Sequence, residues 1–172
     1  MLKTISAGLA LALIASAASA EVKSRTDSSF TLTFERPILA APESVLEAVA
    51  MPAGWWSSEH TYSGDAANIR LDLIPGGCWC EALPDGGVKH AETVLIWPER
   101  RMVRFDAPFG PLQGLGADAV LTMTWADPAD GAERLLRWTF VVNGPGTGAM
   151  ADAIDSVLAE QFRRLGDRLD GL

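Results

Sequence analysis

The sequence predicts an α+β domain in which a large antiparallel sheet curves around one long C-terminal helix. Turn signals rich in proline, glycine and aspartate recur at short intervals in the second half of the chain, as they do between antiparallel strands. The segments between these turns alternate apolar and polar residues, whereas residues 149–169 repeat apolar side chains at helical spacing. The helix and the sheet each have an apolar face to cover, so we expect them to cover each other and to leave a cavity between them.

Seven strands are expected from the alternation of side chains. In the first of them Phe30, Leu32 and Phe34 share one face, because successive side chains point to opposite sides of a strand. The predicted strands cover residues 30–39, 69–74, 78–83, 88–97, 101–106, 119–126 and 133–142.

Two segments have helical rather than strand periodicity. Residues 42–51 start with Pro42 and Glu43, which suit the first turn and the positive end of a short helix. Residues 149–169 carry acidic side chains early and arginines late, which matches the dipole of a long helix. The order of elements is therefore strand, short helix, six strands and long terminal helix.

The first twenty residues predict export. Lys3 precedes a short apolar run over residues 5–15, and Ala18, Ser19 and Ala20 form the small-residue pattern that a signal peptidase recognises. The run is shorter than the roughly 20 apolar residues of a membrane-spanning helix. We expect residues 1–20 to be a signal peptide cleaved after Ala20, leaving residues 21–172 as a single periplasmic or secreted domain without a stable membrane anchor.

Charge excludes two classes of partner. The chain has 22 acidic and 14 basic residues, a formal net charge of −8. An acidic surface repels phosphate backbones and anionic headgroups. Neither a nucleic acid nor a membrane surface is therefore an expected partner, and the sequence does not indicate an oligomeric state.

The densest group of aromatic and polar residues follows the short helix. Trp55, Trp56, His60 and Tyr62 either line the mouth of a cavity, where the rings contact a ligand and His60 or Tyr62 supplies a polar contact, or cover the junction of helix and sheet. His60 and Tyr62 are also the candidate catalytic residues, because either side chain can transfer a proton. Two further aromatic residues are added to the predicted ligand contacts, Trp97 and Phe109.

Cys78 and Cys80 are the only cysteines. Two residues apart on a regular strand, their Cα atoms are separated by roughly 6.6 Å and their side chains are parallel, which disfavours a disulfide unless the backbone bulges. A metal site would require these thiolates to meet His60 and His90 from distant segments. Free or packed thiols are the favoured reading, with a disulfide and a metal site as alternatives.

His90 and Glu92 lie two residues apart on a predicted strand. They could form a histidine–carboxylate pair in the cavity, but the neighbouring apolar set that includes Ala91 and Thr93 competes for the inner face. We expect His90 and Glu92 to face outward.

The long apolar, glycine-rich connection over residues 108–117 is either a lid over the cavity or a loop that packs on the sheet edge.

No cofactor is expected. Gly114 and Gly116 do not belong to a dinucleotide-binding fingerprint, since residue 119 is alanine and no βαβ unit surrounds them. The glycine-rich run over residues 144–148 lacks the lysine and hydroxyl residue of a phosphate-binding loop.

Four features in order suggest a resemblance to a known family. They are the helix over residues 41–49, the pair Trp55 and Trp56, the Pro-Gly-Gly hairpin over residues 71–77 and the terminal amphipathic helix. With these elements in this order, the chain resembles the START-like, or SRPBCC, superfamily, whose fold is a helix-grip of the Bet v 1 type. Within it, the chain is similar to activator-of-Hsp90-ATPase homologues and to polyketide cyclase/dehydrase proteins. The resemblance implies a seven-stranded sheet that holds the C-terminal helix around a hydrophobic cavity.

Three functions are compatible with these observations. The first is an exported domain that binds a small hydrophobic or amphipathic molecule between the sheet and the terminal helix. The second is a cyclase- or dehydratase-like enzyme that uses the same cavity. The third and weakest is a metal or redox protein built on Cys78 and Cys80. A superfamily fold does not choose between them.

Overall fold

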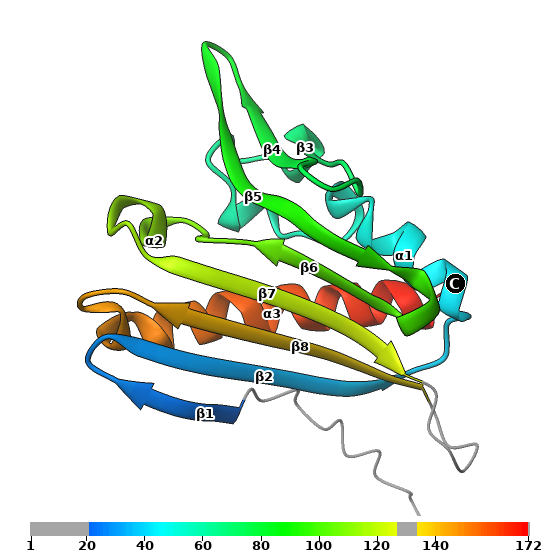
Figure 1. Cartoon of the computed structure of the whole chain (residues 1–172). Coiled ribbons are helices and arrows are strands. Elements are labelled where there is room, and N and C mark those ends of the chain that lie inside the picture. Colours follow the sequence, from blue (N-terminus) through cyan, green and yellow to red (C-terminus); the bar gives the residue numbers. More distant parts are fainter. Residues whose placement is uncertain (1–20, 127–133, 172) are drawn as a thin grey trace, which may run out of the picture.

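The computed structural model describes residues 21–126 and 134–171, which form one antiparallel sheet with a long helix against one face (Figure 1). The sheet has eight strands in the order β1-β2-β8-β7-β6-β5-β4-β3. Their bounds are β1 (Glu21–Thr26), β2 (Ser29–Ile38), β3 (Ile69–Leu71), β4 (Cys78–Leu83), β5 (Gly86–Trp97), β6 (Met102–Asp106), β7 (Asp118–Ala126) and β8 (Arg134–Asn143). The helices are α1 (Pro42–Val49), α2 (Pro111–Gly114) and α3 (Ala151–Asp170).

The predicted α+β fold is confirmed, but the sheet has eight strands rather than seven. The additional strand is β1, which pairs with β2 through a two-residue turn at Asp27 and Ser28. Its sequence, EVKSRT, has no apolar alternation because the strand lies at the edge of the sheet. The predicted signal peptide over residues 1–20 and the turn predicted over residues 127–131 lie outside the described residues.

Other boundaries differ by a few residues. The strand predicted over residues 69–74 ends at Leu71, because Asp72 and Ile74 already form the turn that leads to Gly77. Gly77 is required there: a Cβ at this position would lie 2.1 Å from the carbonyl oxygen of Asp72. In the part of the chain that the structure describes, no helix combines the length and apolar character needed to cross a membrane.

The interior between sheet and helix is filled by aromatic rings. Trp55 makes edge-on contacts with Trp56, Trp79 and Trp138, with ring centroids 5.6, 5.8 and 5.8 Å apart. Trp138 in turn contacts Phe162 of α3 at 5.4 Å. Such edge-to-face pairs add stability beyond the area they bury. The cluster joins the segment after α1 to β4, β8 and α3, so it fixes the distance between sheet and helix.

The two central tryptophans differ in hydrogen bonding. Trp55 Nε1 donates to the carbonyl oxygen of Ala48 at 2.9 Å, which ties the cluster to α1. Trp138 Nε1 is buried without a hydrogen-bond partner among the described residues. A buried donor without an acceptor costs free energy, whereas a satisfied one contributes about 1 kcal/mol.

The C-terminal half of α3 is held to β2 by Arg36. Its guanidinium binds the carboxylates of Asp167 at 3.0 Å and Asp170 at 2.5 Å. The side chain crosses the helix at Gly166, where a Cβ would lie 2.3 Å from Arg36 Nη1. The lack of a side chain at this buried helical position therefore lets the arginine reach both acids.

Strand β5 contains two irregularities. Trp79 pairs with Ala91 and Cys80 with Lys89, so His90 is an extra residue in β5 opposite β4. A second shift between Thr93 and Leu95 occurs against β6. Bulges of this kind bend a strand and change which face a side chain occupies.

Replacing Gly166 by alanine tests the arginine crossing. Glycine to alanine in a helix interior normally stabilises by about 0.5–1 kcal/mol. We expect no such gain for Gly166→Ala in the native background, because the methyl group displaces Arg36. In an Arg36→Ala background the same substitution should stabilise the fold by the normal amount. Urea unfolding of the four proteins measures this difference, and an equal effect of Gly166→Ala in both backgrounds would contradict the packing.

Replacing each central tryptophan by phenylalanine tests the difference in hydrogen bonding. Trp55→Phe should lower the free energy of unfolding more than Trp138→Phe, by about 1 kcal/mol, because it removes one of the two hydrogen bonds that the Ala48 carbonyl oxygen accepts, the other coming from Met51 N. Trp138→Phe removes a donor that has no acceptor among the described residues. Both substitutions remove the same atoms, so each is the control for the other in a thermal or urea unfolding experiment.

Candidate functional site

A pocket of about 180 Å³ lies beside the N-terminal half of α3. Its walls come from the segment after α1, from β5, from the connection that contains α2, and from α3. The residues that line it are Trp56, His60, Tyr62, His90, Phe109, Gly110, Pro111, Met150, Ala153, Ile154, Val157 and Leu158. Nine of these twelve residues are not titratable, so the pocket is apolar with three polar side chains at its wall.

The volume of the pocket limits what it can hold. A cavity of about 150 Å³ lined by apolar side chains is large enough for benzene. The pocket therefore accommodates roughly one six-membered ring with small substituents. The neighbouring interior contains the Trp55 cluster, and this pocket is too small for a long acyl chain.

A buried carboxylate lies behind the pocket wall. Glu81 of β4 is 1% exposed, and its Oε2 atom lies 2.8 Å from His90 Nε2 and 3.1 Å from the backbone nitrogen of Tyr62. The backbone N–H of Ser63 donates to the other oxygen. The carboxylate thus accepts hydrogen bonds from one imidazole and two backbone N–H groups.

These contacts determine the charge of Glu81. Burial by itself raises the pKa of a carboxyl group, but the hydrogen bonds from Ser63, Tyr62 and His90 outweigh it and lower the pKa of Glu81 below its usual value. Glu81 is therefore ionised at neutral pH. An ionised carboxylate can only accept a hydrogen bond, so the hydrogen between Glu81 Oε2 and His90 Nε2 is carried by His90 Nε2.

The structure corrects the predicted orientation of His90. His90 is 5% exposed and faces Glu81, whereas Glu92 forms an ion pair with Lys89 at 2.5 Å. Ala91 and Thr93 are buried as expected. The prediction failed because it assumed regular alternation, and the extra residue in β5 places His90 on the inner side as well.

His60 is held from the opposite wall by α3. The buried side chain of Gln161 accepts a hydrogen bond from Ser57 N at 2.7 Å through its Oε1 atom, which identifies the other end of the amide as the nitrogen. Gln161 Nε2 lies 2.9 Å from His60 Nδ1. An amide nitrogen only donates, so His60 Nδ1 accepts and the hydrogen of the neutral ring is on Nε2. Glu160 Oε2 lies 3.5 Å from the same Nδ1 atom.

The two histidines that line the pocket therefore offer opposite hydrogen-bonding groups. Neutral His60 has an Nε2–H donor, and neutral His90 has a lone pair on Nδ1. Tyr62 stacks on His90 with ring centroids 5.8 Å apart and is 59% exposed, so it lies at the entrance. One donor and one acceptor on an apolar wall can orient a small amphipathic ring.

Four of the six predicted ligand contacts line this pocket: Trp56, His60, Tyr62 and Phe109. Trp55 is fully buried in the aromatic cluster and does not reach it. Trp97 is 44% exposed at the far end of β5, where the Arg100 guanidinium lies 5.3 Å from its ring centroid. These two residues are therefore not part of the same site.

The connection over residues 108–117 has both predicted roles. Phe109, Gly110 and Pro111 line the pocket, while Leu112 is fully buried. Phe109 contacts Trp56 at 5.6 Å and Trp79 at 5.4 Å. The connection thus covers the pocket and is fixed to the aromatic cluster.

Cys78 and Cys80 form a disulfide, which corrects the favoured reading of free thiols. Their Cα atoms are 5.4 Å apart, closer than on a regular strand, and the pairing of β4 with β5 shifts register between Trp79 and Cys80. The bonded sulfurs are not available to a metal ion. Among the described residues, no group of three or more histidine, cysteine or acidic side chains is arranged to bind one.

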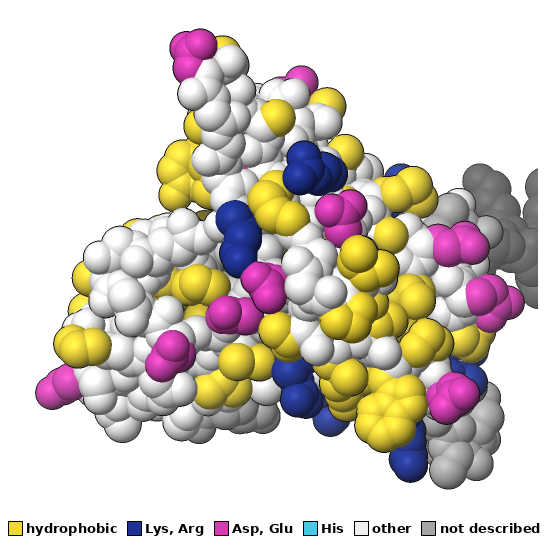
Figure 2. All heavy atoms as spheres, turned by 45° about the horizontal axis from the view of Figure 1, so that its top comes forward, with side chains coloured by type: hydrophobic (Ala, Val, Ile, Leu, Met, Phe, Trp, Pro, Cys, Tyr) yellow, Lys and Arg dark blue, Asp and Glu magenta, His cyan; other side chains and the backbone are white. Residues whose placement is uncertain are grey.

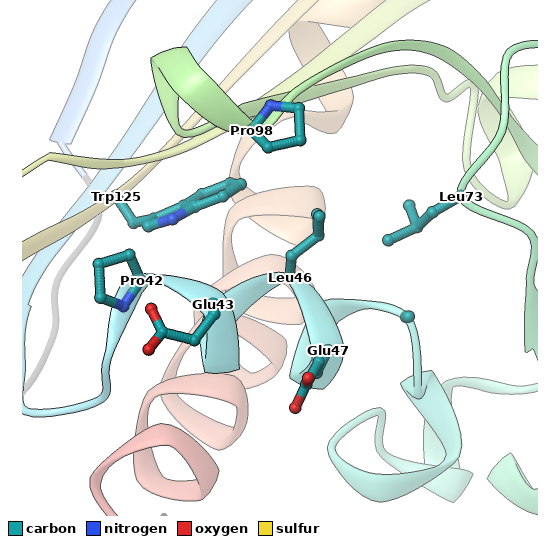
Figure 3. A pocket seen from close by; sticks show the side chains of 8 residues that line it. Pro42, Glu43, Leu46, Glu47, Leu73, Pro98 and Trp125 are labelled. Carbon is teal, nitrogen blue, oxygen red and sulfur yellow. The ribbon is translucent and has the colours of Figure 1, made fainter.

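A second, more open hollow of about 560 Å³ lies beside α1 (Figure 3). Leu46 points toward Pro98 and Trp125, and Glu47 points away from them. On the face that Figure 2 shows, hydrophobic side chains gather between single charged ones, and no histidine is visible. The lining of the hollow is mainly apolar, and its charged side chains are Glu43 and Glu47.

The sequence did not identify Glu81 or Gln161 as site residues. Glu81 follows Trp79 by two positions in β4, so the strand period that buries Trp79 also buries Glu81. Gln161 occupies an apolar-stripe position of α3. In both cases a polar residue at a position expected to be buried was the available signal.

Solved structures of similar fold were found. A protein from Chromobacterium violaceum, CV1439, superposes with a TM-score of 0.54 and 20% identity over 81% of this chain and 96% of its own. A norcoclaurine synthase mutant from Thalictrum, in complex with a transition-state analogue, gives a TM-score of 0.56 and 12% identity over 82% and 94%. CalU16 from Micromonospora echinospora gives 0.53 and 16% over 87% and 82%.

The fold is of the Bet v 1/SRPBCC type. No family model matches the sequence, and no curated protein matches it either. At these identities the similarity establishes the arrangement of sheet and terminal helix and leaves the chemistry to the site.

Acidification tests the buried carboxylate. A carboxyl group whose pKa is lower in the folded than in the unfolded chain stabilises the fold above about pH 4.3, and this contribution disappears as the pH falls through the folded-state value. We expect Glu81→Gln to lower the free energy of unfolding at pH 7. The difference in free energy of unfolding between the variant and the native protein should become smaller at pH 3. Exposed Glu99→Gln is the matched control and should show no such narrowing. A constant gap for Glu81→Gln would contradict the ionised state.

Proposed function

We propose that the protein is an exported binder of a small amphipathic molecule with a single ring, held in the pocket beside α3. The observation that carries the proposal is an apolar pocket of about 180 Å³ whose wall presents one imidazole donor and one imidazole acceptor. Apolar enclosure supplies affinity, and the two histidines select a ligand with hydrogen-bonding groups on its ring.

The interior favours a small ligand over a lipid. A larger ligand would have to displace rings of the Trp55 cluster, which pack against one another at 5.4–5.8 Å. Large-to-small changes in such a core cost several kcal/mol. Displacing the rings carries a similar cost, so we expect a ligand to bind without moving the Trp55 cluster.

Two further features belong to the proposal. The signal-peptide pattern of residues 1–20 supports export. The elements over residues 41–49 and 71–77 support a relation to activator-of-Hsp90-ATPase homologues, but export separates this chain from a cytosolic co-chaperone. The disulfide between Cys78 and Cys80 suits an oxidising compartment.

Ligand-observed NMR tests binding directly. Saturation transfer from the protein to 2-indanone, a small ketone in which one aromatic ring is fused to a cyclopentanone, should be detectable. Ala153 is exposed and lines the pocket, so Ala153→Trp should fill the site and weaken binding at least about tenfold. Ser156 is exposed on the same helix outside the pocket, and Ser156→Trp is the matched control. Equal binding by both variants would place the ligand elsewhere.

Native mass spectrometry of protein isolated from its own export compartment is the complementary experiment. Recorded without reductant, one spectrum reports the mature N-terminus, the two hydrogens lost to the disulfide and the mass of any bound molecule. A small organic mass released on denaturation is expected. A chain that retains residues 1–20 would contradict cleavage after Ala20.

A further inference from the structure

Building on the proposed binding function, we propose that the pocket is also a catalytic site, in which His90 removes a proton from a carbon next to a carbonyl group of the bound ring. His60 donates a hydrogen bond to the carbonyl oxygen, and Glu81 positions His90. The substrate class is a small cyclic or aromatic ketone.

The first step of the argument is that Glu81 and His90 form an oriented pair. Glu81 is 1% exposed and accepts from the backbone nitrogens of Tyr62 and Ser63, so its carboxylate is fixed relative to the backbone. His90 Nε2 lies 2.8 Å from it. A buried carboxylate that accepts from one imidazole nitrogen fixes the tautomer and stabilises the imidazolium that forms when the other nitrogen takes a proton.

The second step is that the other nitrogen of His90 is available. Among residues 21–126 and 134–171, none makes a hydrogen bond to His90 Nδ1. The side chain lines the pocket. A neutral imidazole with its hydrogen on Nε2 has a lone pair on Nδ1, which is the group that a general base requires.

The third step is the presence of a donor in the same pocket. His60 accepts at Nδ1 from Gln161, so its Nε2–H is directed away from α3. Gln161 is itself fixed by Ser57 N and by its contact with the carbonyl oxygen of Val157 at 3.2 Å. A fixed donor in an apolar pocket stabilises negative charge on an oxygen more than the same donor does in water.

The reaction needs only these groups. The α-carbon loses its proton to His90 Nδ1, and the electron pair of that C–H bond becomes the new carbon–carbon double bond. The carbonyl π electrons move to the oxygen, which the His60 Nε2–H stabilises as an enolate. Return of the proton from His90 to the same carbon gives exchange, and return to a conjugated carbon gives isomerisation, with no change in oxidation state.

The composition of the wall argues against acyl transfer in this pocket. None of the twelve lining residues is a serine, threonine, cysteine or lysine, and the remaining polar one, Tyr62, is largely exposed. Those four residue types supply the usual nucleophiles of acyl transfer. Proton transfer requires only the imidazoles.

The experiment is deuterium exchange of 2-indanone in D₂O, followed by the loss of its CH₂ signal in proton NMR. The native protein should accelerate exchange at least about 100-fold over buffer containing an equal concentration of imidazole. His90→Gln should lose this acceleration. His60→Gln should retain part of it, because the base remains but the enolate oxygen loses its donor.

Glu81→Gln separates positioning from folding. The neutral amide no longer stabilises the imidazolium, so the exchange rate should fall about tenfold or more and its pH profile should move to lower pH. The charged or titratable groups that face His90 are Glu81 from β4 and Tyr62 at the entrance, with His60 across the pocket. A purely structural role of Glu81 would lower the folded fraction without moving the pH profile.

Binding and exchange are measured on the same samples, so the two proposals fail separately. Both the binding and the catalytic proposal are supported if saturation transfer and fast exchange are observed, Ala153→Trp blocks them and Ser156→Trp leaves them intact. Saturation transfer without exchange above the imidazole control overturns the catalytic inference and leaves a binding protein. The absence of saturation transfer to 2-indanone overturns both. Ala153→Trp leaves Glu81 and His90 unchanged, so the result does not depend on whether the His90 variant folds.

Discussion

The packing of aromatic rings around Trp55 is the constraint on which the rest of the structure depends. Its ring contacts three other tryptophans, its Nε1 binds Ala48, and its carbonyl oxygen accepts from Arg164 Nε at 2.7 Å. One residue in a short connection thereby touches or binds α1, β4, β8 and α3. The rings occupy the middle of the interior, and the pocket near α2 lies beside them, where it meets the buried Glu81 and His90.

The site arises where an irregularity of β5 and the regular period of β4 meet this packed interior. The extra residue in β5 brings His90 to the inner side, and the strand period in β4 brings Glu81 beside it. A buried carboxylate and imidazole cost desolvation energy that a purely apolar wall would not. The protein retains them at the edge of a pocket, where an oriented imidazole can contact a ligand, and this placement distinguishes the pair from an ordinary ion pair on the surface.

Most of the fold could be predicted because its strands alternate and its terminal helix has a continuous apolar stripe. Strand β1 escaped prediction since an edge strand with polar residues has no such pattern. The orientation of His90 and the bond between Cys78 and Cys80 were predicted wrongly for one reason: both depend on departures from regular strand geometry between β4 and β5, which no period reveals. The structure brings Trp56, His60, Tyr62 and Phe109 to one pocket, whereas Glu81 and Gln161 act through contacts that only the three-dimensional arrangement brings together.

The hydrogen bonds that Glu81 accepts from Tyr62 and Ser63 have a consequence for the shape of the entrance. The carboxylate that orients His90 through Oε2 also accepts from Tyr62 N at Oε2 and from Ser63 N at Oε1, so it holds the backbone next to His60. Access to the pocket and the readiness of its imidazole are thus governed by one carboxylate. Protonation or movement of Glu81 would therefore weaken the hold on the entrance segment and on the His90 ring at the same time.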